Sequence, residues 1–321
     1  MYFSNHSAHD TPKVVAATKQ TTRQKDILSG KRAARNVIAA LDEGRVSGMV
    51  TEWYKKTAKR EQKRLVRDSY HRIEFIVTNH FLEKYLPKRG LVLDAGGGPG
   101  TYAIQLAKKG YDLVLLDLTP ELLTIARKQI QKANLQGRFK AITEGTISDL
   151  SQFPEQTFDA VLCLGGALNH IVDERQRNKA IAELARVTKK NSPIFISVIS
   201  RLGLMTSILV NTPNEIQDCK HHLEKGDYIP RVLPRPKISG FTAAHWFLPE
   251  ELTRLCERHG VQVLEIAALE GLSSLHNKEV NRIAKDKRKW SSWIDIMLRT
   301  CNHPSIVGSS EHFLVVGRRT R

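Results

Sequence analysis

The chain has 321 residues, 41% of them hydrophobic and 26% charged, which is enough to bury a large core as one or two domains. No apolar run approaches the roughly 20 residues that span a bilayer, no secretory leader is evident, and the four cysteines lack the C-x-x-C spacing of a zinc site. The net charge of +17 is compatible with nucleic acid, acidic substrates or anionic surfaces as partners, although we favour a solvated basic face over specific RNA binding. We therefore expect a globular protein of the reducing cytoplasm, without disulfides or a bound metal.

The N-terminal third carries most of the positive charge, with 19 Lys and Arg against 9 Asp and Glu in residues 1–90. Residues 1–48 are predicted to be a basic, poorly ordered arm with at most a short helix over 31–41. The sequence leaves open whether this arm is a targeting segment, a partner-binding arm or the product of an upstream start. In residues 49–90, apolar residues recur at helical spacing and predict two helices, over 50–66 and 68–85.

Residues 91–100 read LVLDAGGGPG and are followed by an amphipathic stretch to residue 109. This pattern predicts a strand, a tight turn and a helix, in which the glycines let the backbone turn and approach a ligand. The spacing Asp94-x-Gly96-x-Gly98-x-Gly100 differs from the G-x-G-x-x-G fingerprint of dinucleotide-binding proteins. A second apolar run over 113–117 ends in Asp117, whose carboxylate could accept hydrogen bonds from ribose hydroxyls.

The next segments continue the alternation of strand and helix. Thr119 and Pro120 predict a helix start with a hydroxyl cap. Further strands are predicted over 141–150, 158–166, 194–199, 261–267 and 312–317, with helices over 174–188 and 249–260 and insertions over 200–240 and 271–305, the latter helical over 278–298. Such alternation predicts an α/β fold with a parallel sheet and helices on both faces, and ligands bind such sheets at the carboxyl ends of the strands.

The glycine loop, the acids after the second and third strands, and the run Phe158-Asp159-Ala160-Val161-Leu162 followed by Leu168-x-His170-Ile171 together resemble class I S-adenosylmethionine-dependent methyltransferases of the small-molecule type. The resemblance implies a Rossmann-like, seven-stranded, mostly parallel sheet whose last strand inserts antiparallel beside the fifth. It also implies a helical lid over 49–90, a cofactor-binding core over 91–200, and substrate-side insertions with the last strands over 201–321. The implied cofactor-binding residues are Asp94, Gly96, Gly98, Gly100, Asp117, Leu118, Ser148, Asp149, Leu164 and Gly165.

Methyl transfer from a sulfonium is an in-line displacement, so orientation can supply much of the rate and catalytic residues are hard to identify. His170 and His245 are candidate bases, although each could instead have a structural role. Topology suggests Tyr54, Tyr70, Asn169 and Trp246 as substrate contacts. The pair His221-His222 has nearby acids but no matching third ligand, so we predict no metal site.

Several alternatives stay open. The basic N-terminal region would suit an RNA or protein methyltransferase, and the fold would suit an NAD(P)-dependent oxidoreductase or a scaffold that has lost catalysis. The fourth strand is followed by Gly165-Gly166-Ala167 and not by the Asn/Asp-Pro-Pro motif of enzymes that methylate base amines, which favours a small-molecule acceptor. The atom methylated (O, N, S or C) and the oligomeric state cannot be predicted.

Overall fold

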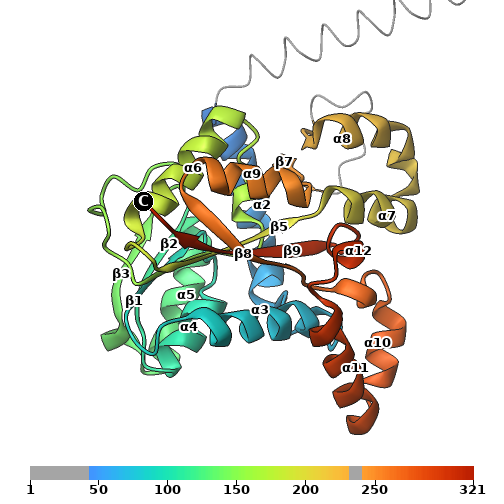
Figure 1. The fold of residues 1–321 in the computed structure, drawn as a ribbon, viewed down its shortest axis with the longest axis horizontal. Helices are drawn as coiled ribbons and strands as arrows, with labels where there is room; N and C mark the ends of the chain where they lie inside the picture. The colour runs from blue at the N-terminus through green and yellow to red at the C-terminus, as the bar shows by residue number, and fades with distance from the viewer. Residues whose placement is uncertain (1–42, 231–240) are drawn as a thin grey trace, which may run out of the picture. The chain divides into compact units, whose positions relative to one another are not determined.

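The computed structural model describes residues 43–230 and 241–321 (Figure 1). The predicted arm up to residue 42, with its short helix over 31–41, lies outside the described residues. The helices are α2 (Glu43–Lys63), α3 (His71–Tyr85), α4 (Thr101–Lys108), α5 (Pro120–Lys132), α6 (Glu174–Val187), α7 (Arg201–Asn211), α8 (Cys219–Lys225), α9 (Pro249–Arg258), α10 (Asn277–Ile283), α11 (Lys287–Thr300) and α12 (Pro304–Val307). The strands are β1 (Leu91–Ala95), β2 (Asp112–Asp117), β3 (Phe139–Glu144), β4 (Ala160–Cys163), β5 (Pro193–Ile199), β6 (Asp227–Tyr228), β7 (Ala244–His245), β8 (Val261–Ala268) and β9 (His312–Arg319).

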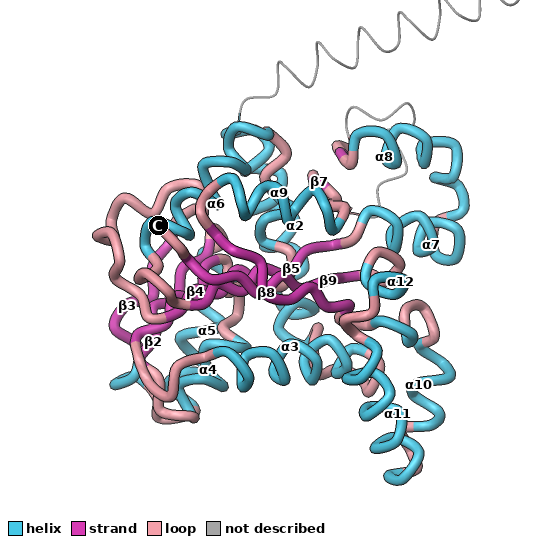
Figure 2. The backbone as a smooth tube through the Cα atoms, in the orientation of Figure 1, coloured by secondary structure: helices cyan, strands magenta, loops and turns pink. Residues whose placement is uncertain are grey.

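Seven of these strands form one twisted sheet in the order β3-β2-β1-β4-β5-β9-β8. Strands β1 to β5 are parallel, while β9 runs antiparallel to both β5 and β8. The predicted sheet and its antiparallel strand beside the fifth are therefore confirmed, and Figure 2 shows the strands between two layers of helices. The insertion after β5 adds a separate ribbon, β6 paired with β7, that the sequence did not predict.

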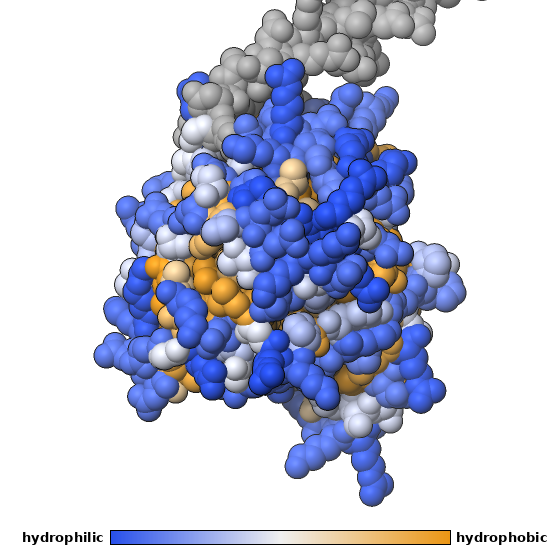
Figure 3. All heavy atoms as spheres, turned by 60° about the vertical axis from the view of Figure 1, so that its left-hand side comes forward, coloured by the Kyte–Doolittle hydropathy of each residue, from blue (hydrophilic) through white to orange (hydrophobic). Residues whose placement is uncertain are grey.

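Helices cover both faces of the sheet because successive strand residues point in opposite directions. Val161 and Cys163 of β4 pack on one face with residues of α6 and α9, whereas Leu162 packs on the other with α3, α4 and α11. All three side chains are fully buried. On the side that Figure 3 shows, hydrophilic residues predominate and hydrophobic ones are visible only in limited patches. Within the described residues, no helix is long and apolar enough to cross a membrane.

The two predicted N-terminal helices are present, with shifted ends. α2 begins at Glu43 instead of residue 50, and α3 begins at His71 instead of residue 68. α2 contacts α5 and the short 3₁₀ turn η2 (Ala167–His170), which follow the carboxyl ends of β2 and β4. It therefore lies across the edge of the sheet at which ligands bind in this class of fold.

Three local predictions were wrong in detail. The side chain of Thr119 does not cap α5; its backbone N–H instead donates to Oδ1 of Asp117 at 2.8 Å. The third strand ends at Glu144, which leaves residues 145–150 as a loop. The predicted helix over 278–298 is two helices, because the Asp286 carboxylate caps a new start at α11.

Candidate functional site

The glycine loop between β1 and α4 is built by close contacts. Gly96, Gly98 and Gly100 have φ values of 77°, 54° and 78°, which L side chains rarely adopt. Gly97 has ordinary φ, but a Cβ there would lie 2.5 Å from Oδ2 of Asp94 and 2.5 Å from Cδ1 of Leu115. The sequence therefore forms this loop because only glycine permits both its backbone conformation and its contact with β1 and β2.

Asp94, the fourth residue of β1, is 1% exposed, and neither carboxylate oxygen makes a hydrogen bond of normal geometry with a described residue. Burial raises the pKa of Asp94 to about 7; the nearby N–H of Ala103 opposes this shift and the charge of Asp117 adds to it. A buried carboxylate without a partner is costly, so its presence indicates a ligand that supplies a cation or hydrogen-bond donors.

Asp117, at the end of β2, holds the glycine loop. Its Oδ2 accepts from the N–H of Gly98 at 2.8 Å, and its Oδ1 accepts from Thr119. Burial raises the pKa of Asp117 to about 6, although these backbone hydrogen bonds oppose the shift. An ionised carboxylate offers about four acceptor positions, so two stay available for the ribose hydroxyls that the sequence assigned to it.

Two other loops complete the same edge. The loop after β3 lies beside the glycine loop. A Cβ added at Gly96 would be 4.0 Å from the side chain of Ile147, which belongs to that loop. In this loop Ser148 is buried, but Asp149 is exposed and accepts from the N–H of Ser151, so its predicted contact with adenine stays a prediction. After β4, Gly165 donates its N–H to Oγ of Ser197 on β5 at 2.8 Å.

Tyr54 and His170 meet at this edge from α2 and η2. The Tyr54 hydroxyl lies 2.8 Å from Nε2 of His170, and Nδ1 of His170 lies 3.0 Å from the carbonyl oxygen of Ala243. Because a carbonyl can only accept, Nδ1 carries the proton, and Nε2 accepts from Tyr54. Burial lowers the pKa of His170, which keeps the imidazole neutral near pH 7. The two residues therefore form a hydrogen-bonded pair in which Nε2 of His170 carries no proton and can accept one.

His245 does not have the geometry of a base. Its Nδ1 lies 2.6 Å from Oδ1 of Asp227, and its Nε2 lies 2.7 Å from Oε1 of Glu251. Glu251 also pairs with Arg201 at 2.6 Å. Both ring nitrogens are thus committed to carboxylates that tie β7 to β6 and α9, and we do not carry the catalytic role of His245 forward.

The other predicted substrate contacts are also engaged within the chain. Tyr70 is 4% exposed and bonds the Glu311 carboxylate through its hydroxyl, which also accepts from the N–H of Leu275. Asn169 is fully buried and joins η2 to β5 and β7 through its side-chain amide. Trp246 packs on Tyr228 within the insertion. These contacts give each of the three residues a role in packing, and their contact with substrate stays a prediction.

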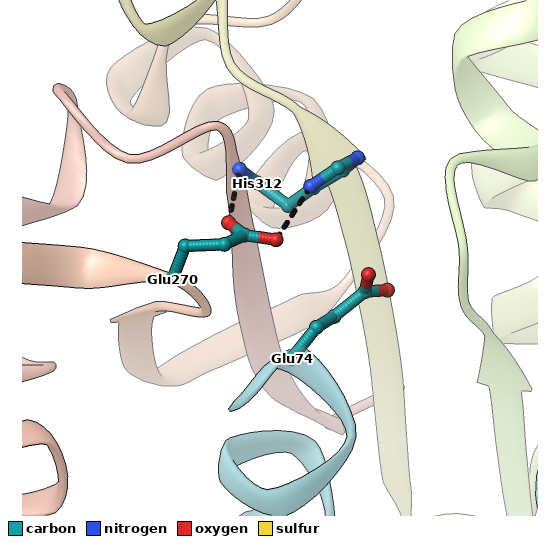
Figure 4. Close-up of side chains that lie close together, drawn as sticks. All are labelled: Glu74, Glu270 and His312. Atoms are coloured by element: carbon teal, nitrogen blue, oxygen red, sulfur yellow. Dashed lines mark hydrogen bonds and ion pairs between the residues drawn. The ribbon is translucent and has the colours of Figure 1, made fainter. Parts of the chain in front are cut away.

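A cluster that the sequence did not predict joins α3 to the ends of β8 and β9 (Figure 4). Oε1 of Glu270 accepts from Nδ1 of His312, and Oε2 accepts from the His312 N–H, each at 2.8 Å. Oε2 of Glu74 pairs with Nη1 of Arg64 at 2.5 Å, and Arg64 also pairs with Glu61. We call Arg64, Glu74, Glu270 and His312 the Arg64–His312 cluster. No local spacing signals it, because its members come from distant segments.

Neighbouring carboxylates keep Arg64 and His312 of the Arg64–His312 cluster protonated. Burial alone would lower the pKa of His312, but Glu270 outweighs it and raises the pKa to about 9. Burial likewise opposes the charge of Arg64, yet Glu74 and Glu61 raise the pKa of its guanidinium. At neutral pH the cluster therefore holds two cations against its two glutamates.

Comparison with known proteins finds similarity in the core of this chain. Residues 92–191 match the methyltransferase domain family. The glycine/sarcosine N-methyltransferase of Parasynechococcus marenigrum is 32% identical over 105 residues, which are 33% of this chain and 36% of that protein. The ubiquinone biosynthesis O-methyltransferase of Xanthomonas oryzae pv. oryzae is 28% identical over 144 residues, or 45% of this chain and 52% of that protein. The chain thus spans between about a third and a half of the length of these relatives.

The fold extends further than the sequence similarity. A SAM-dependent methyltransferase from Methanosarcina mazei superposes with a TM-score of 0.52 at 19% identity, covering 75% of this chain and 97% of that one. At this identity the likeness shows the fold alone. The matched family region includes the glycine loop, Asp117 and His170, but not α2, α3 or the last two strands of the sheet.

Proposed function

We propose that this chain transfers a methyl group from S-adenosylmethionine to an O, N, S or C atom of a small molecule, because residues 92–191 match the methyltransferase domain family and the fold is like that of a SAM-dependent methyltransferase. The observation that carries the proposal is the unpartnered carboxylate of Asp94 beside the glycine loop. The relatives named above are N- and O-methyltransferases, so they support the reaction class without selecting the acceptor atom.

The residues present fit this cofactor. The cofactor carries an ammonium group, which would supply the donors and the positive charge that the buried Asp94 lacks. Asp117 keeps acceptor positions for ribose hydroxyls, and the glycine loop leaves no Cβ between its backbone and a ligand. When bound, the cofactor supplies an electrophilic methyl carbon.

Tyr54 and His170 would remove the proton that the acceptor must lose. We infer a relay in which the Tyr54 hydroxyl hydrogen moves to Nε2 of His170 while the Tyr54 oxygen takes the acceptor proton. The hydrogen bond from Nδ1 to Ala243 fixes the tautomer that leaves Nε2 basic. The acceptor would then be free to attack the methyl carbon in line, with the carbon–sulfur bond breaking and its electron pair staying on the sulfur, and alignment would supply the remaining rate.

Calorimetry tests the cofactor site. We would titrate the full chain with S-adenosylmethionine, S-adenosylhomocysteine and NADH, using wild type and Asp117→Ala. Asp112→Ala is the matched control, because Asp112 begins the same strand but pairs with the exposed Lys140. We expect binding of the first two ligands, weakened only by Asp117→Ala. Binding of NADH alone would overturn the proposal, and binding without methyl transfer to any acceptor would favour a scaffold that has lost catalysis.

A macromolecular acceptor is the second candidate, favoured by the net charge of +17 and its concentration in residues 1–90. RNA methylation would require salt-dependent RNA binding by the full chain that is lost when residues 1–42 are removed. We keep a small molecule as the proposed acceptor, and a nicotinamide oxidoreductase is no longer proposed because the matched family is a methyltransferase domain.

A cytoplasmic location belongs to the same proposal and is supported by four free cysteines.

A further inference from the structure

The two cations of the Arg64–His312 cluster lie at the edge of the sheet where methyl transfer is proposed. Nη2 of Arg64 lies against the loop after β4, since a Cβ at Gly165 would come within 3.0 Å of it. His312 begins β9 and pairs with Ile199, the last residue of β5. A group bound beside Gly165 would therefore lie next to Arg64.

The cations are the accessible members of the cluster. The Arg64 and His312 side chains are 24% and 23% exposed, whereas Glu74 and Glu270 are only 6% and 5% exposed. In the described part of the chain, no acceptor is hydrogen-bonded to Nη2 of Arg64 or to Nε2 of His312. Figure 4 shows the His312 ring with Nδ1 toward Glu270 and Nε2 pointing away from it. The buried carboxylates thus fix the two cations while leaving one N–H donor group on each.

We propose that Arg64 and His312 recognise an acidic group, a carboxylate or a phosphate, on the methyl acceptor. The identity of the ligand as a methyl acceptor rests on the proposed methyltransferase function. The anion site itself does not, because the residues of the cluster define it. A guanidinium and an imidazolium both donate charge-assisted hydrogen bonds, which are stronger than neutral ones. Their glutamate partners keep both groups charged at neutral pH.

A metal ion is the competing ligand. One ligand atom from each of Glu74, Glu270 and His312 lies within 4.8 Å of the other two, a spacing that could hold a cation. However, a metal would need both carboxylates free and the imidazole deprotonated. Here Arg64 occupies Glu74, and Nδ1 of His312 donates to Glu270. Because these carboxylates are already bonded to donors and the accessible side offers N–H groups, the arrangement favours an anion over a metal ion.

The first test measures anion binding without methyl transfer. We would follow the imidazole NMR signals of the full chain, assigning His312 with His312→Gln, while adding sodium acetate or sodium phosphate at constant ionic strength. The expected result is a saturable shift with one of the two anions, weakened about tenfold or more by Arg64→Gln and partly restored by Arg64→Lys. Arg67→Gln is the matched control, because Arg67 lies in the same turn but is half exposed. The anion that saturates identifies carboxylate or phosphate recognition.

Three outcomes would overturn the proposal: no saturable shift, an equal shift with chloride, or loss of the His312 signal on adding Mn²⁺ with tight 1:1 binding. Thermal unfolding of each variant separates lost binding from lost folding. In a second arm, we would compare methylation of glycine with glycinamide and of 4-hydroxybenzoate with 4-hydroxybenzamide. We expect the acid of a methylated pair to be preferred, and Arg64→Gln to abolish that preference by raising KM. No methylation of any acceptor would count against the proposed function, while anion binding would still stand.

Discussion

Gly97→Ala is the sharpest test of how the glycine loop creates the ligand site. The added Cβ would lie 2.5 Å from Oδ2 and Cγ of Asp94 and 2.5 Å from a methyl group of Leu115, distances that real Cβ atoms essentially never show. Leu115 is fully buried and Asp94 nearly so, so the neighbours must shift within a packed core. Overpacking of this kind costs about 1–3 kcal/mol of unfolding free energy.

The same substitution should also weaken cofactor binding, because the group that moves most easily is the Asp94 carboxylate. We expect S-adenosylmethionine affinity to fall about tenfold or more, a loss near 1.4 kcal/mol, measured by calorimetry beside urea unfolding. Gly137→Ala is the control, since Gly137 has nothing within 4 Å of its added Cβ and no positive φ. Unchanged stability and affinity in Gly97→Ala would refute the inferred contact between the loop and Asp94.

Three further predictions follow from the titratable groups. The folded chain holds a proton on Asp94 up to about pH 7, whereas the unfolded chain loses it near pH 4, so stability should fall as pH rises through this window. Urea titrations should show that Asp94→Asn reduces this slope, above all between about pH 6 and 7, because Asp117 with its pKa of about 6 contributes the rest, and also weakens cofactor binding; an unchanged slope in the variant would contradict the assignment. His312 is a cation when protonated, and its pKa in the folded chain, about 9, lies above the usual 6.5. The stabilisation that it gives with Glu270 is therefore present in full below pH 6.5 and is lost as pH rises through about 9. His312→Gln should flatten the unfolding curve between these pH values, and an unchanged curve would show that the pair does not contribute. Once an acceptor is known, Tyr54→Phe and His170→Gln should each lower kcat about 100-fold without changing cofactor affinity, and the lowered pKa of His170 should keep wild-type activity below pH 6.5. A normal kcat in both variants would sink the proposed relay.

The sheet and the loops at the carboxyl ends of its first strands could be predicted because their signals are local. The run that ends in Asp94 and the glycines after it lie within ten residues, and Asp117 ends the next apolar run. The alternation of buried residues sets the strands, and the turn chemistry sets the loops between them. The structure changed only the ends of these elements.

The acceptor side depends on contacts between distant segments, which no local pattern encodes. Tyr54 and His170 were each predicted singly, but their hydrogen bond joins residues 116 apart in the chain. His245 was predicted as a candidate base, whereas the short β6–β7 ribbon brings Asp227 to its ring, a contact that no local spacing encodes. The Arg64–His312 cluster was missed altogether, since a charged residue on a helix usually signals a solvated face.

The placement of these two sides has a consequence for how such a chain could diversify. The elements proposed to hold the cofactor lie within residues 92–191, whereas Arg64 precedes that region and His312 follows it. A chimera in which residues 92–191 come from a relative should therefore inherit the relative's cofactor affinity and still select acceptors as this chain does. New acceptors could arise by changes around Arg64 and His312, provided that α2 keeps Tyr54 beside His170.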